Sequence, residues 1–157
     1  LSLRLGYAPP WGKMVNHKLV GRHNLRYDEV LASNDIYFSL LTGYYAKTVE
    51  AFDDIVYVVT VTRGSLTRRR DYEVIMSRYK VALRYNRFVK QCGLGEYQKS
   101  VAIFLYQARS FGFLALMKML GMAVQYRQNI LIGMSRWIKS YRSSATLDKK
   151  ELKYIVK

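Results

Sequence analysis

The stretch that decides the fold covers residues 65–95 and reads SLTRRRDYEVIMSRYKVALRYNRFVKQCGLG. Its apolar side chains recur in steps of three, four and six, which is the pattern of a helix with one buried face. They are Tyr72, Ile75, Met76, Tyr79, Leu83 and Val89. Ser65 or Thr67 can cap the start, and Gly93 and Gly95 end the pattern. The stretch therefore predicts an amphipathic helix that ends at Gly93 and Gly95.

The polar face of this predicted helix carries a regular row of side chains that are mostly cationic. The row consists of Ser77, Lys80, Arg84, Arg87 and Gln91. Because they lie three or four residues apart, they share one face. Arginines 68–70 come at the beginning, where the positive end of the helix dipole adds to their charge.

Net charge is the composition's largest departure from an ordinary protein. There are 26 Lys and Arg against 11 Asp and Glu, which gives +15 in 157 residues. Such a balance is typical of a protein that binds a polyanion, although a soluble protein can also carry excess charge. A charge of this size would neutralise roughly 15 phosphates, or about seven to eight base pairs of duplex.

One acidic segment interrupts the basic chain. Residues 27–62 hold six acidic side chains against a single cation, Lys47. This unevenness indicates two differently used faces. The acidic part would point away from the polyanion or contact a basic patch on a neighbouring subunit.

The predicted fold class is all-α, a helical bundle with an extended basic N-terminal arm. Residues 1–26 contain both prolines and little periodicity, and they form the arm. Residues 27–142 form the helical domain, with a first helix over about 35–54. Residues 143–157 follow a break and form a basic C-terminal tail or short helix.

Two parts of the helical domain leave alternatives open. Residues 55–62 are almost all β-branched, so either they pair as a strand with another chain or the first helix continues through them, which we prefer. Residues 96–141 contain no proline, and three glycines make one bent helix or two helices equally possible. The longest uncharged run in their apolar centre, residues 110–117, is too short to span a bilayer, so a buried bundle helix is predicted.

Motifs for chemistry are absent. His17 and His23 lie six apart without a nearby acid or cysteine, so no metal site is predicted. The adjacent carboxylates Asp53 and Asp54 point apart on a helix and are solvated charge. Cys92 is the only cysteine, which rules out a disulfide within the chain. We therefore expect no catalytic residues, no cofactor, no small-molecule substrate and no enzymatic activity.

The candidate nucleic-acid-binding residues are the cations of the arm, of the arginine run and of the helix that follows. They are Lys13, Lys18, Arg22, Arg26, Arg68, Arg69, Arg70, Arg78, Lys80, Arg84, Arg87 and Lys90. A cationic row suits phosphates better than base edges, so binding is expected to be non-specific. The 14 tyrosines are expected at subunit interfaces and phosphate contacts, because no strand pattern for base stacking is present.

The whole-chain pattern resembles that of the major capsid proteins of filamentous viruses of hyperthermophilic archaea. The matching features are the arm with Lys13, Lys18, Arg22 and Arg26, and the helix with Arg78, Lys80, Arg84 and Arg87. The resemblance implies helical coat subunits in a virion, wrapped around double-stranded DNA in an A-like form. It also implies that the chain assembles with copies of itself or with a related coat protein.

A second interpretation comes from another class of protein. A basic chain with apolar helices also fits a scaffold subunit of an organellar ribosome or of a respiratory membrane complex, located in a mitochondrion or another organelle. Leu1 in place of methionine is expected of a processed chain. A coat protein would repeat along a helical axis, whereas a ribosomal subunit would occur once in each particle.

Overall fold

The computed structural model describes residues 2–58, 66 and 68–132. Its regular elements are all helical, which confirms the predicted all-α class, and these described residues contain no strand. In chain order they are α1 (Ser2–Gly6), α2 (His17–Arg22), α3 (Asn34–Tyr45), α4 (Tyr72–Gln91), η1 (Gly95–Tyr97), α5 (Ala102–Ala108), η2 (Arg109–Phe111) and α6 (Phe113–Gln125).

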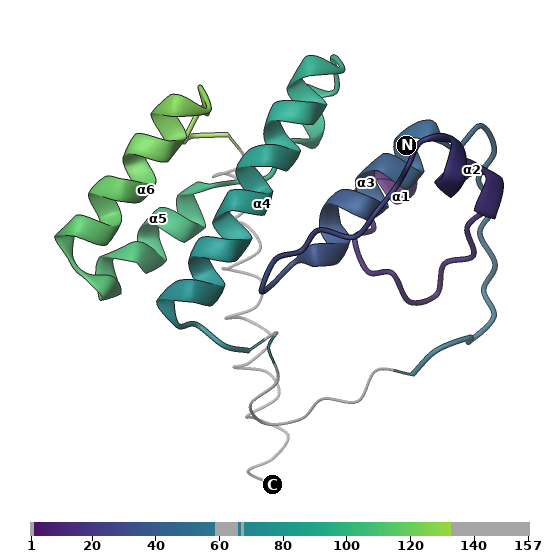
Figure 1. Cartoon of the computed structure of the whole chain (residues 1–157), viewed down its shortest axis with the longest axis horizontal. Coiled ribbons are helices and arrows are strands. Elements are labelled where there is room, and N and C mark those ends of the chain that lie inside the picture. The colour runs from purple at the N-terminus through teal and green to yellow at the C-terminus, as the bar shows by residue number, and fades with distance from the viewer. Residues whose placement is uncertain (1, 59–65, 67, 133–157) are drawn as a thin grey trace, which may run out of the picture.

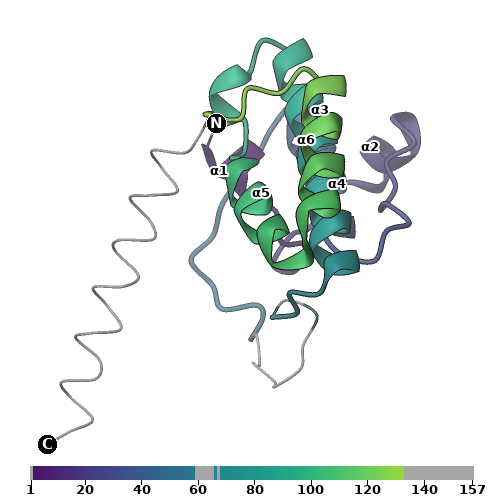
Figure 2. The same ribbon diagram turned by 90° about the vertical axis from the view of Figure 1, so that its left-hand side faces the viewer.

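Helix α4 is the centre of the fold. It lies between the α5–α6 pair on one side and α3 with α1 on the other (Figure 1). The perpendicular view shows α5 and α6 as an outer layer in front of α4 (Figure 2). Both sides of α4 are therefore buried, and one long strip of its surface remains for solvent.

Two hydrophobic clusters hold these layers together. In the first, Ile75, Tyr79 and Leu83 of α4 pack against Leu105 of α5 and Met119 of α6. The buried Tyr79 hydroxyl also donates a hydrogen bond of 2.8 Å to the Met119 carbonyl. The second cluster joins α4 to α3 and α1, and its buried members are Leu5, Leu40, Tyr85 and Val89.

The extended N-terminal arm is not supported by the structure. Residues 2–26 include two short helices, and α1 packs on α3. Leu5 and Leu25 are buried, and the Ser39 hydroxyl donates to the Ala8 carbonyl at 2.6 Å. The burial of these two leucines attaches residues 2–26 to the rest of the fold. Removing each leucine from water is favourable even where the chain has no periodic apolar pattern. The stretch between α1 and α2 is irregular, as expected.

The first helix of the domain is shorter than predicted. Helix α3 ends at Tyr45 rather than near residue 54, and residues 46–58 are neither helix nor strand. The preferred continuation of the helix is therefore wrong for residues 55–58, and residues 59–62 lie outside the described ranges. β-branched side chains such as Thr48 and Val49 lose rotamer freedom in a helix, which favours this early end.

The central helix ends where the sequence predicted but is capped by another residue. Asp71 is the N-cap, and its carboxylate accepts a hydrogen bond of 3.2 Å from the Val74 N–H. This bond lowers the pKa of Asp71, and Arg69 lowers it further. Ser65 and Thr67 lie outside the described residues. Gly93 follows α4 with φ +72°, a conformation that glycine adopts without strain.

The open question over residues 96–141 is answered as far as residue 132. Two helices are present, α5 and α6, and the chain turns between them at Gly112, where φ is +94°. The predicted tail, residues 143–157, lies outside the described part of the chain.

Candidate nucleic-acid interface

The predicted cationic row lies on the strip of α4 that neither hydrophobic cluster covers. Lys80, Arg84, Arg87 and Gln91 are all exposed, and so is Lys90 near the C-terminal end. Lys80, Arg87 and Lys90 have no ion pair or hydrogen bond from their side chains within residues 2–58, 66 and 68–132. Among the residues that the structure describes, none therefore compensates the charge of these three cations on α4.

Arg84 has a different role from its neighbours in the row. Its guanidinium lies 2.6 Å from the Asp28 carboxylate and 3.8 Å from the centre of the Tyr37 ring. The Asp28 side chain is mostly covered. About two turns earlier on α4, the Ser77 hydroxyl exchanges hydrogen bonds with the backbone of Ala32. This edge of α4 holds residues 28–37 in place. The contacts of Arg84 therefore stabilise the fold, unlike those cations of the row that have no partner among the described residues.

The arginines before α4 are also engaged within the chain. Arg69 forms an ion pair of 2.8 Å with Asp71. Arg78 donates to the carbonyls of Leu66 at 2.7 Å and of Arg69 at 3.2 Å, so it secures the loop that carries this run. Arg68 is exposed. Of the predicted residues in this region, Arg69 and Arg78 thus stabilise the entry to α4.

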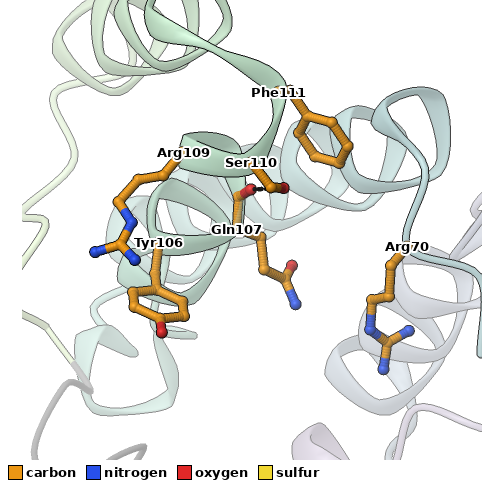
Figure 3. A pocket seen from close by; sticks show the side chains of 6 residues that line it. All are labelled: Arg70, Tyr106, Gln107, Arg109, Ser110 and Phe111. Atoms are coloured by element: carbon orange, nitrogen blue, oxygen red, sulfur yellow. Dashed lines mark hydrogen bonds between the residues drawn. The ribbon is translucent and has the colours of Figure 1, made fainter.

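Arg70 lines a shallow cavity of about 580 Å³ on the side of α5 and η2. The other lining residues are Tyr106, Gln107, Arg109, Ser110 and Phe111. Arg70 and Arg109 stand on opposite sides of the opening, with the Gln107 amide between them (Figure 3). The Arg109 guanidinium lies over the Tyr106 ring, 4.5 Å from its centre. Two guanidiniums, an amide and aromatic rings suit a phosphate with its attached sugar or base.

Arg109 was not among the residues predicted from the sequence. It is far from Arg70 along the chain, and no periodicity links the two, so only the packing of α5 against α4 brings them to one cavity. The pairing of an aromatic residue and an arginine at positions 106 and 109 is the one local signal, since residues three apart on a helix are neighbours.

The N-terminal cations do not join this surface. Lys13 donates to the Tyr7 carbonyl and lies 5.0 Å from the centre of the Tyr7 ring, and burial lowers its pKa. Arg26 donates to the Asn24 side chain at 3.0 Å. Lys18 and Arg22 are exposed on α2, at the opposite edge of the molecule from α6 (Figure 1). The twelve predicted residues therefore form separate groups rather than one patch.

Histidines and carboxylates form no metal-binding group in the described residues. His23 stacks on Tyr45 with ring centres 3.9 Å apart, which gives it a packing role. Of the helices that the structure describes, none is both long enough and apolar enough to cross a membrane.

No protein-family model, curated protein or solved structure matches the chain.

Proposed function

We propose that this protein is a non-enzymatic structural protein that packages nucleic acid, and that it binds the phosphate backbone through the exposed strip of α4. The observation that carries the proposal is the set of uncompensated cations Lys80, Arg87 and Lys90 on one rigid helix. Charges held in a fixed array lose little entropy on binding, so they attract phosphates better than the same charges on a mobile tail.

The spacing of these cations supports contacts with the backbone. At 1.5 Å per residue, Lys80 and Arg87 lie about 10.5 Å apart along α4. Four successive phosphates of one duplex strand span about 10 Å along the axis, in three steps of roughly 3.4 Å. The side chains are long and cationic, which suits phosphates rather than a particular base. The cavity with Arg70 and Arg109 offers a further phosphate position beside α4.

The form of packaging that we propose is a coat protein on double-stranded DNA in a helical virion. The resemblance to capsid proteins of filamentous archaeal viruses supports it, and so does the net charge of +15. Each subunit would neutralise about 15 phosphates. A scaffold subunit of a larger assembly is the second candidate, favoured by the exposed apolar side chains of α6.

The first test replaces the three uncompensated cations of α4. The variant Lys80→Gln, Arg87→Gln, Lys90→Gln is expected to bind a double-stranded DNA fragment on the order of tenfold more weakly, or worse, because it loses direct phosphate contacts. Binding is measured by fluorescence anisotropy at fixed salt. Arg84 is left in place, because its contacts with Asp28 and Tyr37 stabilise the fold.

The matched control is the variant Lys18→Gln, Arg22→Gln, Lys47→Gln, which loses the same charge from exposed positions outside α4. A much smaller loss is expected from it. Equal losses in both variants would mean that net charge acts without a defined interface, and a larger loss in the control would place the interface at α2. Circular dichroism verifies that both variants remain folded.

A further inference from the structure

Helix α6 is apolar on its outer face as well as its inner one. Met119 and Ala123 are buried in the first cluster. On the other side, Leu114, Met117 and Val124 are exposed, and the exposed fractions of Leu114 and Val124 are 83% and 75%. Together with the exposed Gly121, these residues follow steps of three, four and three, which places them in one stripe. Nothing in the described part of the chain covers this stripe.

Residues 46–58 form a second exposed apolar surface of a different kind. They have no regular secondary structure, and Phe52 and Ile55 are 77% and 89% exposed. Tyr57 stacks on Trp11, with ring centres 6.0 Å apart, and this contact holds the segment against the molecule. Large exposed apolar side chains gathered in one place usually mark an interaction surface.

The two surfaces carry opposite charge. The segment 46–58 contains the exposed acids Glu50, Asp53 and Asp54. Exposed cations stand before, on and after α6: Arg109, Lys118 and Arg127. An acidic apolar segment and a basic apolar helix face are complementary in both polarity and sign.

The same molecule cannot bring these surfaces together. Helix α6 lies at one edge of the fold and the segment at the other, with α4 and α3 between them (Figure 1). In the view with α6 in front, the segment runs down the left of the helices and is faded by its distance from the viewer, so it lies farther back than α6 (Figure 2). Complementary surfaces at opposite edges suit contact between successive copies of the chain.

We propose that residues 46–58 of one copy dock on the outer face of α6 of the next copy, in a head-to-tail arrangement. Such a contact joins two different surfaces, so a bound pair still has one free segment and one free α6 face. Further copies can therefore add, and the chain of copies grows into a filament or closes into a ring. Pairing of α6 with α6 would bring two copies of Lys118 together, and pairing of two segments would bring Asp53 and Asp54 of both copies together. Like charges disfavour both alternatives.

This inference extends the packaging proposal by naming the protein partner and the surfaces. It does not require nucleic acid, and it is tested on nuclease-treated full-length protein. Its failure and a failure of DNA binding are therefore distinguishable.

The experiment measures the weight-average mass of the full chain by sedimentation at increasing concentration. The segment variant is Phe52→Ser, Ile55→Ser, and the helix variant is Leu114→Ser, Val124→Ser. The wild-type chain is expected to associate beyond a dimer, and each variant alone is expected to remain at the monomer mass of 18.4 kDa. An equimolar mixture of the two variants is expected to form a 1:1 dimer, because the intact helix face of one accepts the intact segment of the other.

The other outcomes overturn the proposal. If the segment variant still associates alone, its intact α6 face pairs with α6 of another copy. If the helix variant still associates alone, its intact segment pairs with the segment of another copy. A wild-type chain that stays monomeric at every concentration has no such contact. The variant Met14→Ser, Leu31→Ser is the control, since it removes two exposed apolar side chains elsewhere and should associate like the wild type. All the substituted positions are exposed, and thermal melts establish that the variants fold.

Discussion

Gly43 is where α3 makes its closest approach to α1. A Cβ built on this glycine would overlap the backbone carbonyl of Arg4. The Arg4 guanidinium in turn donates to the carbonyls of Gly43 and Ala46 at the end of α3. A cation that donates to the last carbonyls of a helix also opposes the negative end of its dipole. The missing side chain thus allows the contact that ties the N-terminal segment to the domain.

Gly43→Ala is therefore expected to destabilise the protein by about 1–3 kcal/mol, because the added methyl group forces α1 away from α3. Gly121→Ala is the control, since it adds the same group inside α6 with open space around it. That substitution should stabilise by up to about 1 kcal/mol through helix propensity. Urea denaturation measures both. Equal stabilisation by the two would show that α1 does not need this approach.

For the cations of α4, residue type and spacing alone do not separate the residues that we propose for binding a partner from those that stabilise the fold. Lys80, Arg84 and Arg87 are indistinguishable by spacing, and all were predicted to bind phosphate. The structure separates Arg84, because Asp28 and Tyr37 come to its side of the helix. Nothing near residue 84 in the sequence indicates this contact, which spans 56 positions along the chain.

Among the elements, α4 contributes to both hydrophobic clusters, and Tyr79 joins it to α6. Burial raises the pKa of Tyr79 to about 12, and burial also raises the pKa of Tyr85. The folded state therefore keeps these protons at a pH where the unfolded chain, with a tyrosine pKa near 10, has lost them. Stability from this source is fully present below about pH 10 and is lost as the pH rises toward about 12.

We accordingly expect the free energy of unfolding to fall between about pH 10 and 12, and to fall less steeply in Tyr79→Phe. The variant also loses the hydrogen bond to Met119, which costs about 1 kcal/mol at neutral pH. Chemical denaturation at several pH values measures both effects. Tyr27→Phe alters an exposed ring and should follow the wild-type profile. An unchanged alkaline slope in Tyr79→Phe would contradict the assignment.

For the whole molecule, the distribution of charge distinguishes the surface that we propose for a polyanion from the rest. The exposed acids of residues 46–58 and the uncompensated cations of α4 belong to different parts of the fold, so each can contact a partner of opposite sign. Under the proposed function, the α4 cations would release counterions on binding a nucleic-acid backbone, so the affinity would fall with salt and would not depend on base sequence.

The affinity for duplex DNA is expected to depend on salt and not on base sequence. Two duplexes of unrelated sequence should bind with affinities within a few fold of each other, and log K should fall linearly with log salt. In the variant that lacks the cations of residues 80, 87 and 90, the slope should be shallower by about 3, one unit for each lost phosphate contact. Titrations at four or more salt concentrations measure it. A slope that is unchanged in this variant, or a strong preference for one duplex, would argue against phosphate contacts by α4.

The sequence by itself determined the helical class, the central helix with its end at Gly93, and the solvent-facing row of cations. These depend on local periodicity and turn chemistry, which are written in neighbouring residues. It did not predict the burial of Leu5 and Leu25, the end of α3 at Tyr45 or the partner of Arg84. Only the tertiary structure decided these, because each depends on contacts between residues far apart in the chain, and such contacts override local propensity.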